Sequence, residues 1–275
     1  MEGKDYDFVE LSFGKTCYQV KGGGTFPVVV LVHGLSSPMC IWDKNIDEMV
    51  KAGLCVVRYD LYGRGKSSRP KLRYNADLFI SQLKELIEYL SLPLPVHLVG
   101  LSMGGAIVAE FTVRYPKMVD RIGLIAPAGL IKRSVGVRVI TLPVIGKIIY
   151  EIFGKEALIR GVLETIGDSV EDRKRMREVY EEQMNIAGYR DAILSTLKYG
   201  PLYGKYLIYE ELGKQTRKGC LIWGKCDDVV PYILSEEILR CVPWLKLYAI
   251  EGGTHTVNYQ KANEVNPILC SFFTS

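Results

Sequence analysis

PVHLVGLSMGGAIVAEF, residues 95–111, contains a G-x-S-x-G motif between two apolar runs. The first run is typical of a strand and the second of a helix, so the motif predicts an abrupt strand-to-helix turn with Ser102 at its apex. Gly100 and Gly104 remove Cβ atoms that would otherwise collide in such a turn. The Ser102 hydroxyl would then stand clear of the sheet at a helix N-terminus, whose unpaired N–H groups favour a developing negative charge. A serine that only caps the helix would show the same pattern, so partner residues decide between the two interpretations.

The chain has three histidines, and their surroundings differ. His97 lies inside the apolar run before Ser102, which is typical of a core or strand-end residue. His33 follows an apolar run and precedes a glycine, where it would shape a loop. His255 follows the apolar run 245–250 in a loop that contains two glycines. Because imidazole titrates near neutral pH, as a general base for a serine hydroxyl must, His255 is the candidate base.

A carboxylate should orient that imidazole, and residues 221–231, LIWGKCDDVVP, offer Asp227 and Asp228 after another apolar strand. The chain order serine, aspartate, histidine is that of the α/β-hydrolases. The sequence resembles this family, whose members commonly show G-x-x-D-x-x-x-P at this point. The resemblance implies that Asp227 completes a catalytic triad with Ser102 and His255. Asp228 is the adjacent alternative, for which a solvated loop carboxylate is the better interpretation.

Two further motifs extend the resemblance over the N-terminal half. Residues 32–37, VHGLSS, are similar to the family's H-G-x loop, which implies that the backbone N–H groups of Leu35 and Met103 form an oxyanion hole. Such donors are worth roughly 3–4 kcal/mol each. Residues 60–67, DLYGRGKS, match the family's D-x-x-G-x-G-x-S turn, to which the resemblance gives a structural role. The turn ends like a phosphate-binding P-loop, but Asp60 occupies the position of the first P-loop glycine, which excludes that interpretation.

Strand-like and helix-like segments alternate along residues 1–126 and again along residues 218–275. This alternation predicts a mostly parallel sheet covered by helices, with ligands at the carboxyl ends of its strands. Residues 127–217 are helical in composition and interrupt the alternation. The resemblance implies an α/β-hydrolase fold in which residues 1–126 and 218–275 form the core. Residues 127–217 would be an inserted helical cap that excludes water and supplies the substrate pocket.

Composition limits the partners of the chain. A net charge of +4 over 275 residues is too small to argue for nucleic-acid binding. Seven cysteines without C-x-x-C spacing, and a polar N-terminus unlike a signal peptide, predict a cytoplasmic protein. Because histidines and cysteines do not cluster, we expect no metal, and no motif predicts a cofactor. The most apolar stretch, Val135–Gly154, is interrupted by charges and a proline and is a poor membrane span, although the cap could contact a membrane surface transiently.

Within the family, the chain resembles monoacylglycerol-lipase-like enzymes and carboxylesterases, with the C–C bond hydrolases close by. The resemblance implies a cofactor-independent serine hydrolase of carboxylic esters, and we expect small lipid monoesters such as monoacylglycerols as substrates. Trp42 and Met103 are the expected pocket residues, together with apolar residues of the cap. Two alternatives stay open: hydrolysis of a C–C bond in vinylogous diketones, and a ligand receptor that retains the triad. A chromogenic ester separates a receptor from an enzyme, and the oligomeric state does not follow from the sequence.

Overall fold

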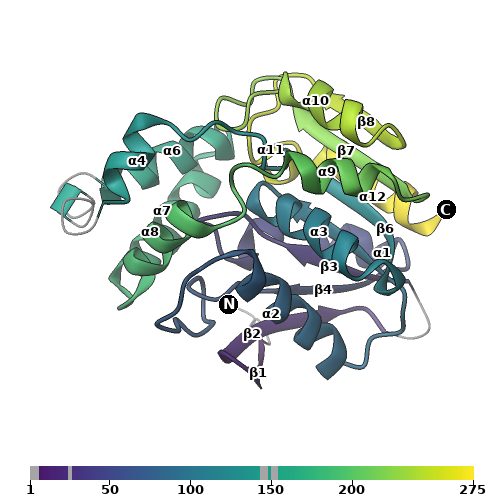
Figure 1. Ribbon diagram of the computed structural model, residues 1–275, viewed down its shortest axis with the longest axis horizontal. Helices are drawn as coiled ribbons and strands as arrows, with labels where there is room; N and C mark the ends of the chain where they lie inside the picture. The colour runs from purple at the N-terminus through teal and green to yellow at the C-terminus, as the bar shows by residue number, and fades with distance from the viewer. Residues whose placement is uncertain (1–5, 24–26, 143–147, 150–153) are drawn as a thin grey trace.

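Eight strands form a sheet in the order β1-β2-β4-β3-β5-β6-β7-β8. The computed structural model describes residues 6–23, 27–142, 148–149 and 154–275 (Figure 1). β2 is antiparallel to both of its neighbours, and the other neighbouring pairs are parallel, which confirms the predicted mostly parallel sheet. The strands are β1 (Asp7–Leu11), β2 (Gly14–Lys21), β3 (Val28–Val32), β4 (Cys55–Tyr59), β5 (Val96–Leu101), β6 (Val119–Ile125), β7 (Lys218–Gly224) and β8 (Leu245–Ile250).

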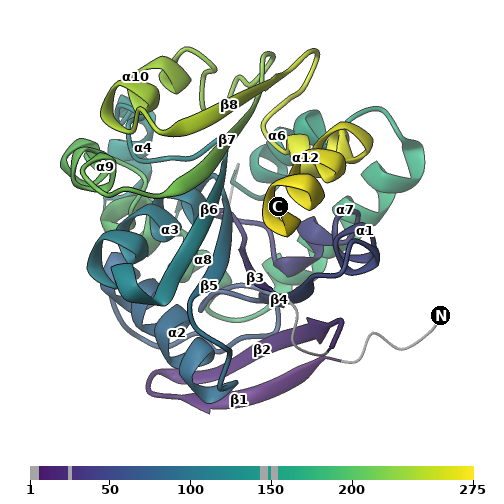
Figure 2. The ribbon, with the colours of Figure 1, turned by 90° about the vertical axis from the view of Figure 1, so that its right-hand side faces the viewer.

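Helices cover both faces of this sheet (Figure 2). Apolar side chains of α2 (Ala76–Tyr89), α3 (Met103–Arg114), α9 (Tyr206–Gly213) and α10 (Leu234–Cys241) share one core cluster with the sheet. On the opposite face, α1 (Ile46–Lys51), α11 (Val257–Gln260) and α12 (Ala262–Thr274) contribute to a second cluster. Because helices lie on both faces, every residue of β3, β4 and β5 is buried, which explains why these strands are mostly apolar on both faces.

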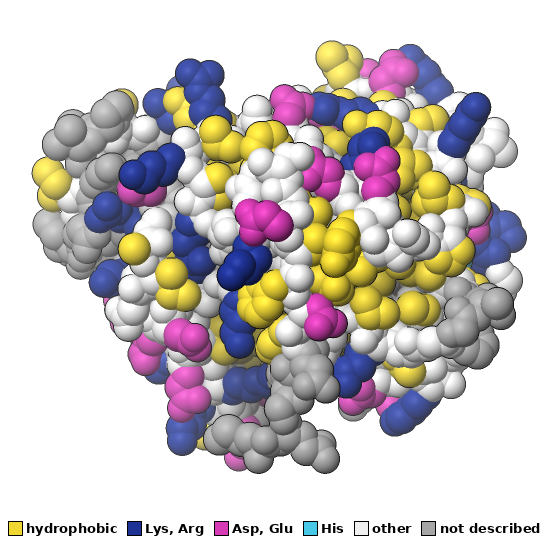
Figure 3. Space-filling view, turned by 90° about the horizontal axis from the view of Figure 1, so that it is seen from below, with side chains coloured by type: hydrophobic (Ala, Val, Ile, Leu, Met, Phe, Trp, Pro, Cys, Tyr) yellow, Lys and Arg dark blue, Asp and Glu magenta, His cyan; other side chains and the backbone are white. Residues whose placement is uncertain are grey.

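The antiparallel pair β1–β2 forms one edge of the sheet. Seen from below, hydrophobic side chains gather in the middle of the surface, on the side where this hairpin lies (Figure 3). Phe8, Phe13 and Val20 belong to this hairpin, and each is more than a third exposed. None of the residues of β1 and β2 is among those described as lining the cavity of the site below.

Four helices follow β6 and precede α9 in the described part of the chain: α4 (Val135–Ile140), α6 (Lys155–Ile166), α7 (Val170–Asn185) and α8 (Tyr189–Tyr199). They project to one side of the sheet in Figure 1. β6 and β7 are neighbours in the sheet, so the whole segment between them is an excursion from the core. α9 differs from the other four because it packs against α3 and α10 on the sheet.

The apolar stretch Val135–Gly154 is only partly described, because residues 143–147 and 150–153 lie outside the described ranges. Within those ranges, none of the helices combines the length and the apolarity needed to cross a bilayer.

Candidate active site

Ser102 occupies the turn between β5 and α3. Its φ of 56° and ψ of −118° are values that residues with a side chain rarely adopt, so the turn stores backbone strain. The Ser102 N–H donates to the Ile125 carbonyl at 2.9 Å, and the Ser102 carbonyl accepts from the Ala128 N–H at 2.9 Å. These two bonds fix the turn against the carboxyl end of β6.

The glycines beside Ser102 allow three backbones to touch. A Cβ on Gly100 would lie 2.3 Å from the Gly104 carbonyl oxygen, and a Cβ on Gly104 would lie 2.2 Å from the Val32 carbonyl oxygen. Both distances are far below those that real Cβ atoms show. The predicted collision is therefore confirmed, and it involves β3 as well as the turn itself.

Asp227 and His255 meet beyond the ends of β7 and β8. The His255 Nδ1 lies 2.8 Å from Asp227 Oδ2, and Asp227 Oδ1 accepts from the N–H groups of Val229 at 2.9 Å and Val230 at 2.8 Å. The Asp227 side chain is completely buried, whereas the neighbouring Asp228 is exposed. A carboxylate that accepts from Nδ1 fixes the tautomer in which His255 Nε2 carries no proton and can accept one.

His33 shapes the loop that carries Leu35. The His33 Nε2 accepts from the Leu61 N–H at 2.8 Å, so the ring proton lies on Nδ1 and is donated to the Gly34 carbonyl at 2.9 Å. Burial lowers the pKa of His33 to about 3, which keeps the ring neutral and this tautomer fixed. His97 is also buried, but it packs against Phe273 and takes no part in this site.

A cavity of about 460 Å³ brings several of these residues together. Ser102, His255 and Leu35 line it from the sheet side, and residues of α4, α6, α7 and α8 line it from the other side. Its apolar lining includes Ile131, Val137, Leu158, Val162, Leu197 and Leu202. The cavity therefore joins a polar floor to mostly apolar walls, as substrate pockets commonly do.

The two expected pocket residues lie elsewhere. Trp42 and Met103 are fully buried and are not among the residues described as lining this cavity. Trp42 belongs to the short helix η1 (Met39–Trp42), and its ring packs in the core cluster on the α1 and α12 face. The Met103 side chain packs in the opposite cluster, so only its backbone, at the start of α3, belongs to the turn.

Arg64 has a contact that sequence reasoning missed. It lies in the D-x-x-G-x-G-x-S turn, where Ser67 Oγ donates to the Asp60 carbonyl at 2.6 Å and so supports the structural role of that turn. The fully buried guanidinium of Arg64, however, reaches out of the turn and donates from Nε to the Leu35 carbonyl at 2.7 Å. Burial lowers the pKa of Arg64 to about 10, so the group remains charged at neutral pH. Nothing in the local motif predicts this partner.

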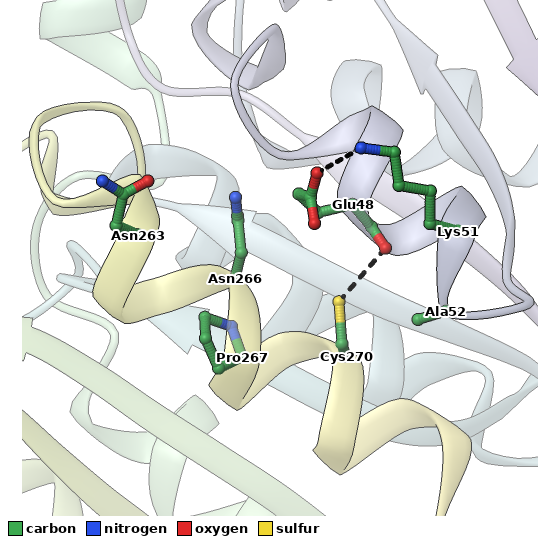
Figure 4. Close-up of a pocket in the computed structure, with 7 residues that line it drawn as sticks. All are labelled: Glu48, Lys51, Ala52, Asn263, Asn266, Pro267 and Cys270. Atoms are coloured by element: carbon green, nitrogen blue, oxygen red, sulfur yellow. Dashed lines mark hydrogen bonds and ion pairs between the residues drawn. The ribbon is translucent and has the colours of Figure 1, made fainter.

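A second cavity, of about 400 Å³, lies between α1 and α12 (Figure 4). Asn263 and Asn266 line it on one side and Glu48 and Lys51 on the other, with Cys270 at 3.5 Å from the Glu48 carbonyl. It shares no residue with the cavity at Ser102. None of the three residues predicted to form a triad lines this second cavity.

The sheet, its covering helices and the turn at Ser102 define a serine α/β-hydrolase. More particularly, the chain belongs to the family described as "Serine aminopeptidase, S33", whose model matches residues 25–261. An uncharacterized protein of Mycobacterium tuberculosis is 26% identical over 118 residues, and this match covers 43% of the present chain and 33% of the relative. The chain thus spans about a third of the length of that relative.

Other relatives match over most of their length. Human monoacylglycerol lipase ABHD6 is 24% identical over 284 residues, covering 99% of this chain and 80% of the lipase. A 2-hydroxy-6-oxononadienedioate/2-hydroxy-6-oxononatrienedioate hydrolase of Klebsiella pneumoniae is 24% identical over 258 residues. This match covers 89% of this chain and 86% of that hydrolase. The crystal structure of a Bacillus anthracis bromoperoxidase superimposes with a TM-score of 0.82 at 21% identity, covering 98% of this chain and all of the other. These names describe different reactions on one fold.

Proposed function

We propose that this protein hydrolyses carboxylic esters through an acyl-enzyme on Ser102. The observation that carries the proposal is the 2.8 Å contact between His255 and the buried Asp227, together with the cavity that Ser102 and His255 line in common. His255 Nε2 would take the proton of the Ser102 hydroxyl while Oγ forms a bond to the ester carbonyl carbon.

The tetrahedral intermediate would collapse when His255 returns this proton to the leaving alcohol. Water, deprotonated by the same nitrogen, would then attack the acyl carbon. The bond between this carbon and Ser102 Oγ would break, Oγ would take the proton back from His255, and the carboxylic acid would leave. In both steps the carbonyl oxygen becomes negative. The Leu35 and Met103 N–H groups are the proposed donors to that oxygen, because Leu35 borders the cavity and Met103 begins α3 beside the nucleophile.

The walls of the cavity support a lipid-like acyl chain as the substrate. Apolar residues from the helices between β6 and β7 would accept the chain, and each buried methylene would contribute about 0.8 kcal/mol of transfer free energy. The likeness to a monoacylglycerol lipase over nearly the whole chain agrees with this substrate class. We therefore propose monoacylglycerols and other small lipid esters as substrates.

Hydrolysis of a C–C bond is the second candidate, and Lys132 favours it. Among the residues described as lining the cavity, Lys132 is the one lysine or arginine, and it is exposed. A cation in that place could pair with a carboxylate of a substrate such as the dioates named for the Klebsiella relative.

A panel of substrates tests both candidates. Purified protein should hydrolyse p-nitrophenyl esters, with kcat/KM rising from acetate to a medium-chain optimum, and it should also cleave monoacylglycerols. Activity confined to vinylogous diketones would transfer the assignment to C–C hydrolysis. If neither class is cleaved, while fatty acids or their esters still bind, the protein is a receptor.

We also propose that α4 brings the cavity to a membrane surface. α4 has no buried residue, and Val135 is 74% exposed next to the cationic residues Arg133 and Arg138. The protein should sediment with phosphatidylglycerol vesicles more than with phosphatidylcholine vesicles, and Val135→Asp should reduce that binding. Equal sedimentation of the parent and Val135→Asp would exclude α4 as the contact.

A further inference from the structure

The segment Leu35–Ser36 is held by side chains from three different parts of the chain. Arg64 donates to the Leu35 carbonyl at 2.7 Å. From α8, the Tyr189 hydroxyl donates to the Ser36 carbonyl at 3.1 Å. From α7, the Tyr180 hydroxyl makes a 3.2 Å hydrogen bond with Ser36 Oγ. Two consecutive residues of the loop beside Ser102 are thus fixed by partners outside that loop.

Arg64 also links this loop to α8. Its Nη2 donates to Thr196 Oγ1 at 2.7 Å, and its Nη1 donates to the Tyr62 carbonyl at 3.0 Å. Arg64, Tyr189 and Thr196 are all completely buried. Moving an acceptor away from a buried guanidinium strongly destabilises the folded state, because it leaves part of a buried charge without a hydrogen bond. Each of these acceptors is therefore held firmly in place.

The peptide groups on both sides of the Leu35 Cα are therefore constrained. The Gly34 carbonyl accepts from His33, and the Leu35 carbonyl accepts from Arg64. The Leu35 N–H belongs to the first of these two peptides, and hydrogen bonding at the carbonyl of a peptide strengthens the N–H of the same peptide as a donor. The direction and the strength of this donor depend on both contacts.

We propose that Arg64, Tyr180 and Tyr189 are positioning residues that aim the Leu35 N–H at the oxyanion, so that catalysis depends on the docking of α7 and α8. This inference rests on the proposed function, because it assumes that Leu35 is an oxyanion donor. It assigns to these helices a second role besides enclosing the substrate. The contacts that these two helices make with Leu35–Ser36 determine the turnover rate.

A positioning role predicts a particular pattern in the kinetics. The donor acts on charge that develops only in the transition state, so weakening it lowers kcat and leaves KM nearly unchanged. A merely structural role would lower the unfolding temperature without changing kcat well below that temperature. Tyr189 and Thr196 are the sharpest probes, because neither is among the residues described as lining the cavity.

Tyr189→Phe and Thr196→Val each remove one hydroxyl of this network, and Thr112→Val is the matched control. The Thr112 side chain is also fully buried in a helix, α3, and donates to a backbone carbonyl, that of Val108, at 2.7 Å. With a p-nitrophenyl ester, we expect each network variant to lose about 5-fold in kcat at constant KM, as expected for one hydrogen bond. The control should keep its kcat while losing similar thermal stability.

Affinity for n-butylboronic acid gives an independent readout, since its tetrahedral serine adduct places an oxygen in the oxyanion position. The inhibition constant should rise by the same factor as kcat/KM falls in both network variants. Unchanged kcat and unchanged boronate affinity in an active, folded Tyr189→Phe protein would overturn the inference and leave the proposed function intact. A parent protein that hydrolyses no ester would overturn both.

Discussion

The strand-end loops that carry Ser102, Asp227 and His255 differ from the helices that face them across the cavity. In the loops, backbone touches backbone, and these three residues are at most 8% exposed. In α4, by contrast, no residue is buried. Contacts between backbones allow few residue types at a position, whereas side chains that fill a cavity can be exchanged for others of similar volume. We therefore expect substitutions in the loops to affect the proposed chemistry, and substitutions in the helices to affect the choice of substrate.

Among substitutions in the loops, replacement of Ser102, the proposed nucleophile, should have the largest effect on activity. Ser102→Ala should reduce kcat for a p-nitrophenyl ester by about 10⁶-fold, because triad members act as a unit. Its unfolding temperature should stay near that of the parent. A fluorophosphonate probe should label the parent and also Ser37→Ala, which changes another buried serine that lines the cavity. Labelling that persists in Ser102→Ala would disprove the assignment.

Replacement of Asp227, the proposed orienting carboxylate, should give the next largest loss of kcat. Asp227→Asn should reduce kcat by about 10⁴-fold, because an amide that donates to Nδ1 stabilises the wrong imidazole tautomer. The exposed neighbour Asp228 provides the control, and Asp228→Asn should change kcat by less than about 3-fold. Equal losses in the two variants would mean that the hydrogen bond between His255 and Asp227 is not the one that orients the base.

Gly104 tests whether contact between backbones controls the loop region. A Cβ at this position would collide with the carbonyl oxygens of both Val32 and His33, at 2.2 and 2.6 Å, so β3 and α3 would have to separate. Gly104→Ala should therefore cost about 3 kcal/mol or more of unfolding free energy. Differential scanning calorimetry should show a lower unfolding temperature, and an unchanged temperature would contradict the close approach.

The sequence predicted the contact between Asp227 and His255, but it did not predict the lining of the cavity. The motif around Ser102 and the aspartate and histidine after later strands are short-range patterns, and the structure places Asp227 against His255. Trp42 was wrongly expected in the pocket, because an aromatic residue near the loop fits a core position equally well. Tyr189 reaches Ser36 across 153 residues, and no local pattern encodes such a pairing. Contacts of this kind depend on how the helices dock.

His33 should give the loop region a distinct response to acid. Its pKa in the folded protein is about 3 because of burial, so between pH 3 and 6.5 the unfolded chain binds a proton that the folded protein does not. The folded state therefore loses stability as pH falls below about 6.5. When the pH is lowered from 7 to 5, this group should reduce the free energy of unfolding by about 2 kcal/mol.

His33→Gln should remove that part of the acid sensitivity, and urea unfolding at the two pH values measures it. Asp60 acts in the opposite sense, because burial raises the pKa of its carboxyl to about 6, but it is present in both proteins and cancels in the comparison. The variant should have a lower free energy of unfolding than the parent at pH 7, and this free energy should fall less between pH 7 and pH 5 than it does in the parent. An equal fall in the two proteins would mean that His33 is not buried in its neutral form.

Gly161 gives the smallest effect and the most direct contrast with Gly104. It lies within α6 and lines the cavity, and a Cβ built on it meets no atom within 4 Å. Gly161→Ala should therefore stabilise the protein by about 0.5–1 kcal/mol through helix propensity. The added methyl group occupies about the space of one methylene, so the preferred p-nitrophenyl ester should become about one carbon shorter. A shift in chain-length preference without loss of kcat on short esters would place substrate choice in the helices. If the preference is unchanged, the acyl chain does not pass α6.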